Sequence, residues 1–99
     1  MLKLSGEVFC GDQEYGIHKP TLDKVAKQVM ELSKLGLEMV IVVGGGNIWR
    51  FRDTTQSGIE RTASDAMGML ATIMNSVALQ SALEAHGAET RVCSAVDVP

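Results

Sequence analysis

Three glycines and an asparagine, Gly44-Gly45-Gly46-Asn47, follow a short apolar run and are the first candidate for chemistry. Glycine has no Cβ, so the N–H groups of a glycine run can approach phosphate oxygens closely. The run could also be a tight turn that only requires positive φ angles, and both interpretations remain open from these residues alone. Neither a Walker loop nor the dinucleotide fingerprint matches the spacing of the glycines.

Two cationic side chains, Lys3 and Arg50, could accompany a phosphate. Lys3 is a lone charge in an apolar segment, where Lys is rare unless it faces an anion. A phosphoryl group in transfer is such an anion, and positioned cations stabilise it. The alternative is a Lys that extends its ammonium group into solvent. Arg50 has the planar fork that suits phosphate, although Arg50 and Arg52 could also be a solvated surface.

Asp65 could accept hydrogen bonds from sugar hydroxyls, or it could cap a helix, as could Ser64. The remaining reactive residue types give no pattern. The two histidines, His18 and His86, and the two cysteines, Cys10 and Cys93, have no metal-ligand spacing, so we predict no metal site. Both thiols are expected to be buried or half-buried.

Five segments must position these residues. The sequence predicts three strands and two helices, in the order strand 1–5, helix 20–35, strand 39–43, helix from Ser64 or Asp65 to His86, and strand 91–95. Residues 11–16 and 50–63 are expected to be loops, the second with a short helix. This alternation predicts an α/β fold with a parallel sheet and helices packed on its faces. Ligands of such sheets bind at the carboxyl ends of the strands, where Lys3 to Gly6 and the glycine run both lie.

The composition is that of one globular domain. The chain has 99 residues, of which 45% are apolar and 21% charged, and its net charge is −3. Because no basic patch occurs, we expect no nucleic-acid partner. We also expect no membrane span, because no apolar stretch of about 18 residues was identified. The absence of a signal peptide predicts a cytoplasmic protein. A final strand without a covering helix predicts that more sheet follows residue 99.

Three motifs together carry a family resemblance. Lys3-Leu4-Ser5-Gly6-Glu7 resembles the opening motif of the bacterial uridylate kinases, within the amino acid kinase superfamily. The segment from Val43 to Arg50 resembles the glycine loop of that family, and the segment from Asp65 to Asn75 resembles its D-H-M-G-M-L-A-T-x-M-N helix. The resemblance covers nearly all 99 residues, but only about the first half of a family member. It implies the N-terminal portion, residues 1–99, of a single amino acid kinase domain with three α/β/α layers and a mainly parallel sheet.

Two departures from the family pattern are visible. Phe51-Arg52-Asp53 stands where the family has Gly-x-Gly after its arginine, and Ala66 replaces the histidine that follows the aspartate.

The resemblance implies transfer of the γ-phosphoryl group of ATP to UMP, which gives UDP. Lys3 would be the catalytic residue. The ATP site would comprise Lys3, Leu4, Ser5, Gly6, Gly46 and Arg50. The UMP site would comprise Gly45 and Asp65. The segment associated with activation by GTP would comprise Gly11, Asp12, Gln13, Glu14, Tyr15 and Gly16. Mg²⁺ would accompany ATP through ligands outside this chain, and the protein would form homohexamers.

Two other functions remain open. One is another amino acid kinase that phosphorylates a carboxylate or a carbamate, although Asp65 at the acceptor site would repel such a substrate. The other is a module without catalysis that binds a nucleotide phosphate or only oligomerises. We expect the 99-residue chain alone to be inactive, because the part of the family that binds adenine is missing.

Overall fold

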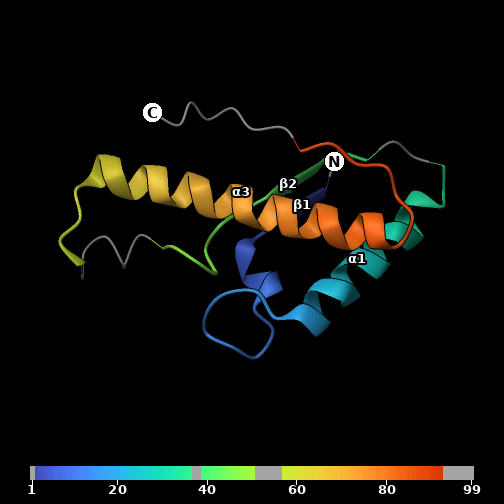
Figure 1. The fold of residues 1–99 in the computed structure, drawn as a ribbon, viewed down its shortest axis with the longest axis horizontal. Helices are drawn as coiled ribbons and strands as arrows, with labels where there is room; N and C mark the ends of the chain where they lie inside the picture. Colours follow the sequence, from blue (N-terminus) through green and yellow to red (C-terminus); the bar gives the residue numbers. More distant parts are fainter. Residues whose placement is uncertain (1, 37–38, 51–56, 93–99) are drawn as a thin grey trace.

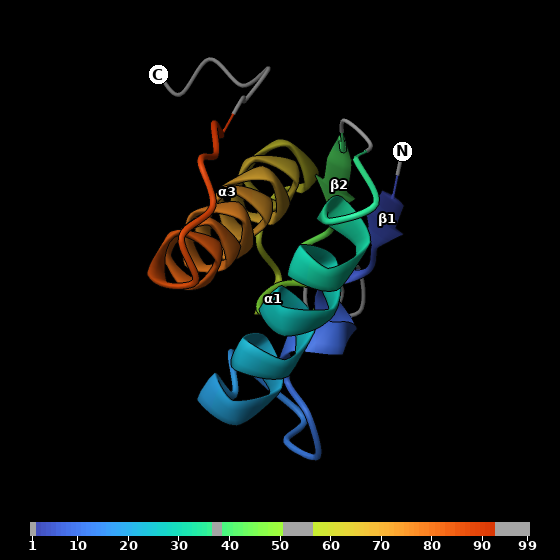
Figure 2. The same ribbon diagram turned by 90° about the vertical axis from the view of Figure 1, so that its right-hand side faces the viewer.

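The computed structural model describes residues 2–36, 39–50 and 57–92 (Figure 1). The elements are β1 (Leu2–Leu4), the 3-10 helix η1 (Gly6–Phe9), α1 (Lys19–Ser33), β2 (Ile41–Val43) and α3 (Arg61–Ala85). The long helix α3 extends across the strand pair, and α1 packs beside it (Figures 1 and 2).

The two strands are parallel neighbours, as the βαβ pattern predicts. Their register pairs Leu2 with Ile41, Lys3 with Val42, and Leu4 with Val43. The backbone N–H of Gly44 donates to the carbonyl of Leu4 at 2.9 Å, so the pairing extends one residue beyond β2. Both strands are shorter than the predicted 1–5 and 39–43.

Helix α1 matches its predicted segment within two residues at both ends, whereas α3 matches at its end but not at its start. Helix α1 was expected at 20–35; it begins after His18, has Pro20 in its first turn, and ends before Gly36, whose φ is +79°. Helix α3 begins at Arg61, one turn earlier than predicted, so the prediction that Ser64 or Asp65 caps it is wrong. The N–H of Ser64 already donates to the carbonyl of Glu60 at 2.9 Å, which places Ser64 inside the helix.

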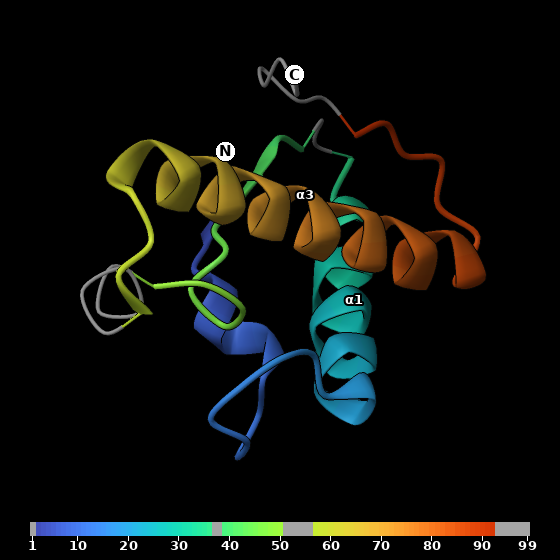
Figure 3. The same ribbon diagram turned by 60° about the vertical axis from the view of Figure 1, so that its left-hand side comes forward.

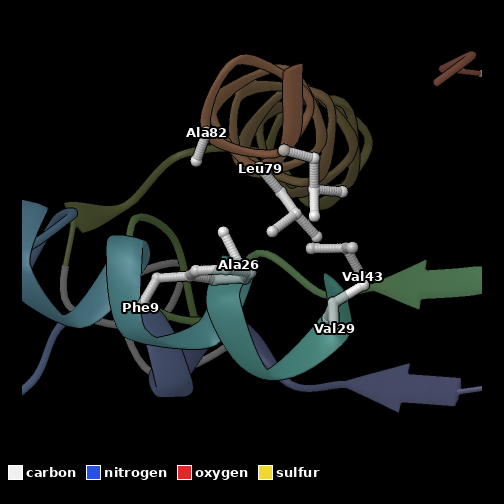
Figure 4. Close-up of a cluster of buried hydrophobic side chains, with 7 residues drawn as sticks. Phe9, Ala26, Val29, Val43, Leu79 and Ala82 are labelled. Atoms are coloured by element: carbon white, nitrogen blue, oxygen red, sulfur yellow. The ribbon is translucent and has the colours of Figure 1, made fainter. Parts of the chain in front are cut away.

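The core lies between both helices and one face of the strands (Figure 4). Its buried members are Phe9, Ala26, Val29, Val43, Leu79, Ala82 and Leu83. Leu2 and Leu4 pack against them, whereas Lys3 and Val42 are exposed on the other face of the sheet. Alternation along the strands therefore directs Lys3 away from the helices.

The parallel strands with packed helices confirm the α/β class. Both described helices, α1 and α3, pack on the same face of the strands. The second helical layer, predicted for the opposite face, does not occur among the described residues. The predicted strand 91–95 is only partly testable, since residues 91 and 92 are not in a strand and residues 93–95 lie outside the described residues.

Helix α3 is long and apolar enough, by length and composition, to cross a membrane, so the expectation that no segment has these properties is wrong. No charged residue occurs between Asp65 and Glu84. The helix nevertheless buries two polar residues, Ser64 and Asn75, against the rest of the fold, and it contacts α1, β2 and η1. We therefore describe it as a core helix with one exposed apolar side.

Candidate functional site

The loop after β2, residues 44–50, lies between η1 and α3 (Figure 3). A Cβ atom built on Gly6 would be 2.6 Å from the backbone nitrogen of Gly46, closer than real Cβ contacts allow. A Cβ on Gly45 would be 2.9 Å from the Gly68 carbonyl oxygen in α3. Glycine at positions 6 and 45 is therefore required by close backbone approach, and the ends of both strands meet here, as predicted.

All four carbonyl groups of the run accept hydrogen bonds from within the protein. The Gly44 carbonyl accepts from the Asn75 side chain at 2.7 Å, and the Gly45 carbonyl accepts from the N–H groups of Ile48 and Trp49 at 3.0 and 3.1 Å. The carbonyl of Gly46 accepts from Arg50 Nε, and the carbonyl of Asn47 accepts from the N–H of Gly16 at 2.8 Å.

The N–H groups of the glycine run differ from its carbonyls, because most of them have no hydrogen-bond acceptor among the described residues. Among the described residues, the N–H groups of Gly45, Gly46 and Asn47 have no protein acceptor. The same holds within this described part for the N–H groups of Gly6 and Glu7, at the start of η1. A loop whose carbonyls are occupied and whose N–H groups are available offers donors only, which is the arrangement that binds an anion.

Two buried amides hold the loop from behind. Asn47 and Asn75 are both 0% exposed, and each side-chain amide donates to the oxygen of the other, at 3.1 and 2.6 Å. The second proton of Asn47 Nδ2 goes to the Gly16 carbonyl at 2.8 Å. No buried side-chain polar atom in the described part of the chain lacks a partner. The role of Asn47 and Asn75 in holding the loop was not predicted. Both amides lie in segments that meet at a strand end, and this placement could have indicated a contact between them.

Arg50 connects the glycine run to the loop of residues 11–16. Its Nε donates to the Gly46 carbonyl and its Nη2 donates to the Glu14 carbonyl at 3.1 Å. In this structure the guanidinium group therefore serves two backbone carbonyls. Its predicted role at the phosphates of the nucleotides stays a prediction.

The 11–16 segment is a loop, as predicted, and its residues are exposed except for half-buried Gly16. Both Gly11 and Gly16 have positive φ, of +60° and +78°. Gly16 is fixed to Asn47 by two hydrogen bonds, so this loop is directly attached to the glycine run. The structure does not test the predicted association of this loop with GTP.

The other predicted residues surround the loop at different depths. Leu4 is half-buried and its carbonyl accepts the Gly44 N–H, while Ser5 is exposed and precedes η1. Lys3 is exposed, and within the described residues its side chain has no hydrogen bond or ion pair. Asp65 is exposed on α3, where helical spacing places it on the same face as Gly68, the residue that contacts Gly45.

Trp49 is a further residue that the sequence did not single out. Its indole Nε1 donates to the buried Ser64 hydroxyl at 2.7 Å, which joins the end of the loop to the first turns of α3. The hydroxyl predicted as a helix cap thus lies inside α3 and accepts a hydrogen bond from an indole.

A cavity of about 480 Å³ lies elsewhere, between α1, β2, α3 and residues 88–92. None of the predicted site residues lines it, and its floor consists of core residues such as Val29, Ile41 and Leu83. We assign the site to the glycine loop, because polar groups converge there. Among the described residues no group of three or more His, Cys, Asp or Glu side chains could hold a metal ion. Cys10 is buried and free, as predicted, and Cys93 lies outside the described residues.

Known proteins match this chain along its length. The model of the amino acid kinase family matches residues 1–99. The uridylate kinase of Roseobacter denitrificans is 53% identical over 96 residues, which are 97% of this chain and 40% of that protein. The uridylate kinase of Cereibacter sphaeroides is 52% identical over 97% of this chain and 39% of its own length.

Solved structures agree. UMP kinase from Ureaplasma parvum superposes with a TM-score of 0.89 at 35% identity, over 98% of this chain and 42% of that one. UMP kinase from Bacillus anthracis gives a TM-score of 0.78 at 34% identity, over 85% of this chain and 34% of that one. The chain therefore spans about two fifths of the length of the curated relatives named here.

Proposed function

Because this chain belongs to the amino acid kinase family, we propose that the protein transfers the γ-phosphoryl group of ATP to UMP and that this chain provides the acceptor side of the site. In this proposal residues 1–99 are one portion of a single amino acid kinase domain. The observation that carries it is the loop of Gly44 to Asn47, which offers unbonded N–H groups while all its carbonyls are occupied.

The phosphate of UMP would bind the N–H groups of Gly45 and Gly46, because a donor-only loop stabilises an anion without a competing acceptor. Asp65, on the α3 face that borders this loop, would accept hydrogen bonds from the ribose hydroxyls. The exposed ammonium group of Lys3 would approach the phosphoryl group in transfer and stabilise its charge. Ser5, Gly6 and Arg50 would contribute to binding the phosphates of ATP.

Mg²⁺ would enter with ATP and neutralise charge on its phosphates. Among the described residues no three His, Cys, Asp or Glu side chains gather into a metal-binding group, and we propose that the protein ligands of the ion lie outside this chain. We also propose that the reaction takes place in the cytoplasm. We also propose that GTP activates the enzyme through residues 11–16, which are attached to the glycine run through Asn47 and Arg50.

Self-association is part of the proposal. Four apolar side chains form an exposed stripe on α3, which we call the α3 stripe: Met69, Leu70, Met74 and Val77. They are 41–55% exposed, and no charge interrupts the stripe. An exposed apolar patch of this kind favours burial against another molecule, and a second copy of the chain would supply the same uncharged surface.

The test is a chimera in which residues 1–99 replace the matching stretch of the Cereibacter sphaeroides uridylate kinase. We expect UMP-dependent formation of ADP from ATP, at a kcat within about tenfold of the parent. A tenfold lower kcat corresponds to an activation free energy about 1.4 kcal/mol higher. A chimera that folds like the parent but shows no such turnover would contradict the proposal. Turnover with a carboxylate or carbamate acceptor, and not with UMP, would instead favour the other kinase class.

A further inference from the structure

The Asn75 side chain fixes the orientation of one peptide group in the glycine run. Its Nδ2 donates to the Gly44 carbonyl at 2.7 Å, across the boundary between α3 and the loop. A trans peptide is planar, so the N–H of Gly45 must point opposite to the Gly44 C=O. The described chain contains no cis peptide. Asn75 thus directs the Gly45 N–H away from itself, and that N–H is one of the unbonded donors.

The orientation of Asn75 is itself fixed. The reciprocal hydrogen bonds with Asn47 use one proton of each NH₂ group, and the carbonyls of Gly16 and Gly44 take the other two. If either amide were rotated by half a turn, its oxygen would face a carbonyl oxygen and both groups would lose a partner. The two outer carbonyls therefore determine both amide orientations. Full burial of both residues raises the cost of breaking any of these bonds.

We propose that Asn75, held by Asn47, is a positioning residue that aims the Gly45 N–H at the phosphate of the bound nucleotide. The inference rests on the proposed function, because it assumes that the anion is the acceptor phosphate. Asn75 touches no substrate in this proposal; it acts only through the Gly44–Gly45 peptide. Its loss should therefore affect ligands with a phosphate and spare those without one.

The variant that tests this is Asn75→Leu, which has nearly the same shape, adds no charge that would itself repel a phosphate, and removes both donated hydrogen bonds. Binding of UMP and of uridine to the 99-residue chain would be compared by calorimetry. We expect UMP to bind at least about tenfold more weakly, because one charge-assisted hydrogen bond to its phosphate is lost. Uridine should bind as before. Ser76→Ala is the matched control, because among the described residues the Ser76 hydroxyl bonds only to the Thr72 carbonyl in its own helix.

Equal weakening of UMP and uridine binding would show a purely structural role and overturn the proposal, as would unchanged binding of both. If Asn75→Leu does not fold, the backbone amide resonance of Gly45 in the unchanged chain decides. It should move on addition of UMP and not of uridine. An unmoved Gly45 resonance in a chain that binds UMP would contradict the proposal.

Inorganic phosphate separates this inference from the proposed function. Phosphate that shifts the Gly45 resonance, in a chain that does not bind UMP, would support the positioning role and contradict the nucleotide assignment. A chain that binds neither phosphate nor UMP would contradict both.

Discussion

Gly6 and Gly46 bring the ends of the two strands into backbone contact, because a Cβ on Gly6 would lie 2.6 Å from the Gly46 nitrogen and 2.6 Å from the Asn47 Oδ1. Neither neighbour can move without breaking the bonds that hold the loop. Pairing of β1 with β2 and the shape of the anion loop therefore depend on each other at this contact.

We predict that Gly6→Ala destabilises the chain by about 1–3 kcal/mol, the usual cost of forcing extra atoms into a packed site. Urea unfolding measures it. Gly68→Ala is the control of opposite sign, because Gly68 lies inside α3 and, beyond its own helix backbone, no atom of the described residues lies within 4 Å of its Cβ position. That change should stabilise the chain by up to about 1 kcal/mol. Equal unfolding midpoints for the two variants would contradict the close contact.

Two adjacent glycines should respond differently to the same change. A Cβ on Gly45 would meet α3 backbone atoms at 2.9 Å, whereas among the described residues a Cβ on Gly46 would meet only the flexible Glu7 side chain, nearest at 3.4 Å. We predict that Gly45→Ala costs more than 1 kcal/mol, on the order of an overpacked core site, and that Gly46→Ala changes stability by less than about 0.5 kcal/mol. Thermal unfolding of both variants measures this, and a reversed order would show that the loop does not lie on α3.

The hydrogen bond from Trp49 to Ser64 should contribute about 1 kcal/mol to stability. Trp49→Phe and Ser64→Ala, singly and combined, form a double-mutant cycle that isolates the pair. We expect a coupling energy of about 0.5–1.5 kcal/mol. A coupling energy near zero would mean that the indole N–H is bonded to water instead.

Lys3→Ala, made in the chimera, should lower kcat by about a hundredfold or more, as the loss of one stabilising group at a transition state does. The KM for UMP should change little, because Lys3 is assigned to the transferred group and not to the acceptor. Steady-state kinetics with varied UMP checks both. A variant with unchanged kcat would remove Lys3 from the mechanism.

Met74→Lys should prevent self-association through the α3 stripe, because Met74 is 55% exposed and a buried charge at an interface is costly. Light scattering after size-exclusion chromatography gives the mass. Gln28→Lys adds the same charge to an exposed position on α1 and should leave the mass unchanged. If both variants keep the mass of the original chain, the α3 stripe is not the contact.

Strong local patterns made the fold largely predictable. The β-branched run before Gly44 and the helical spacing of Leu22, Val25 and Val29 indicated β2 and α1 within a few residues. The start of α3 was misplaced because Ser64 is a good capping residue by type, while its hydroxyl is used by Trp49, a contact that no local pattern reveals.

The site was predictable only in part. Glycine spacing indicated the loop, and strand topology indicated that Lys3 to Gly6 would lie beside it. The two buried asparagines were missed because their partners are carbonyls far away in the sequence, which periodicity does not register. Arg50 was expected to face phosphate, yet here it donates to the Gly46 and Glu14 carbonyls, partners that no pattern in the sequence indicates.

Three of the four carbonyls of the glycine run are bonded by Gly16, Arg50 and Asn75, which lie outside the run, and the fourth by Ile48 and Trp49. The loop therefore has its shape before any anion arrives, and binding requires little ordering of the backbone. A preorganised loop loses little conformational entropy on binding, so more of the interaction energy appears as affinity. Loosening any of the three attachments should then weaken binding through entropy, even where no contact to the ligand is lost.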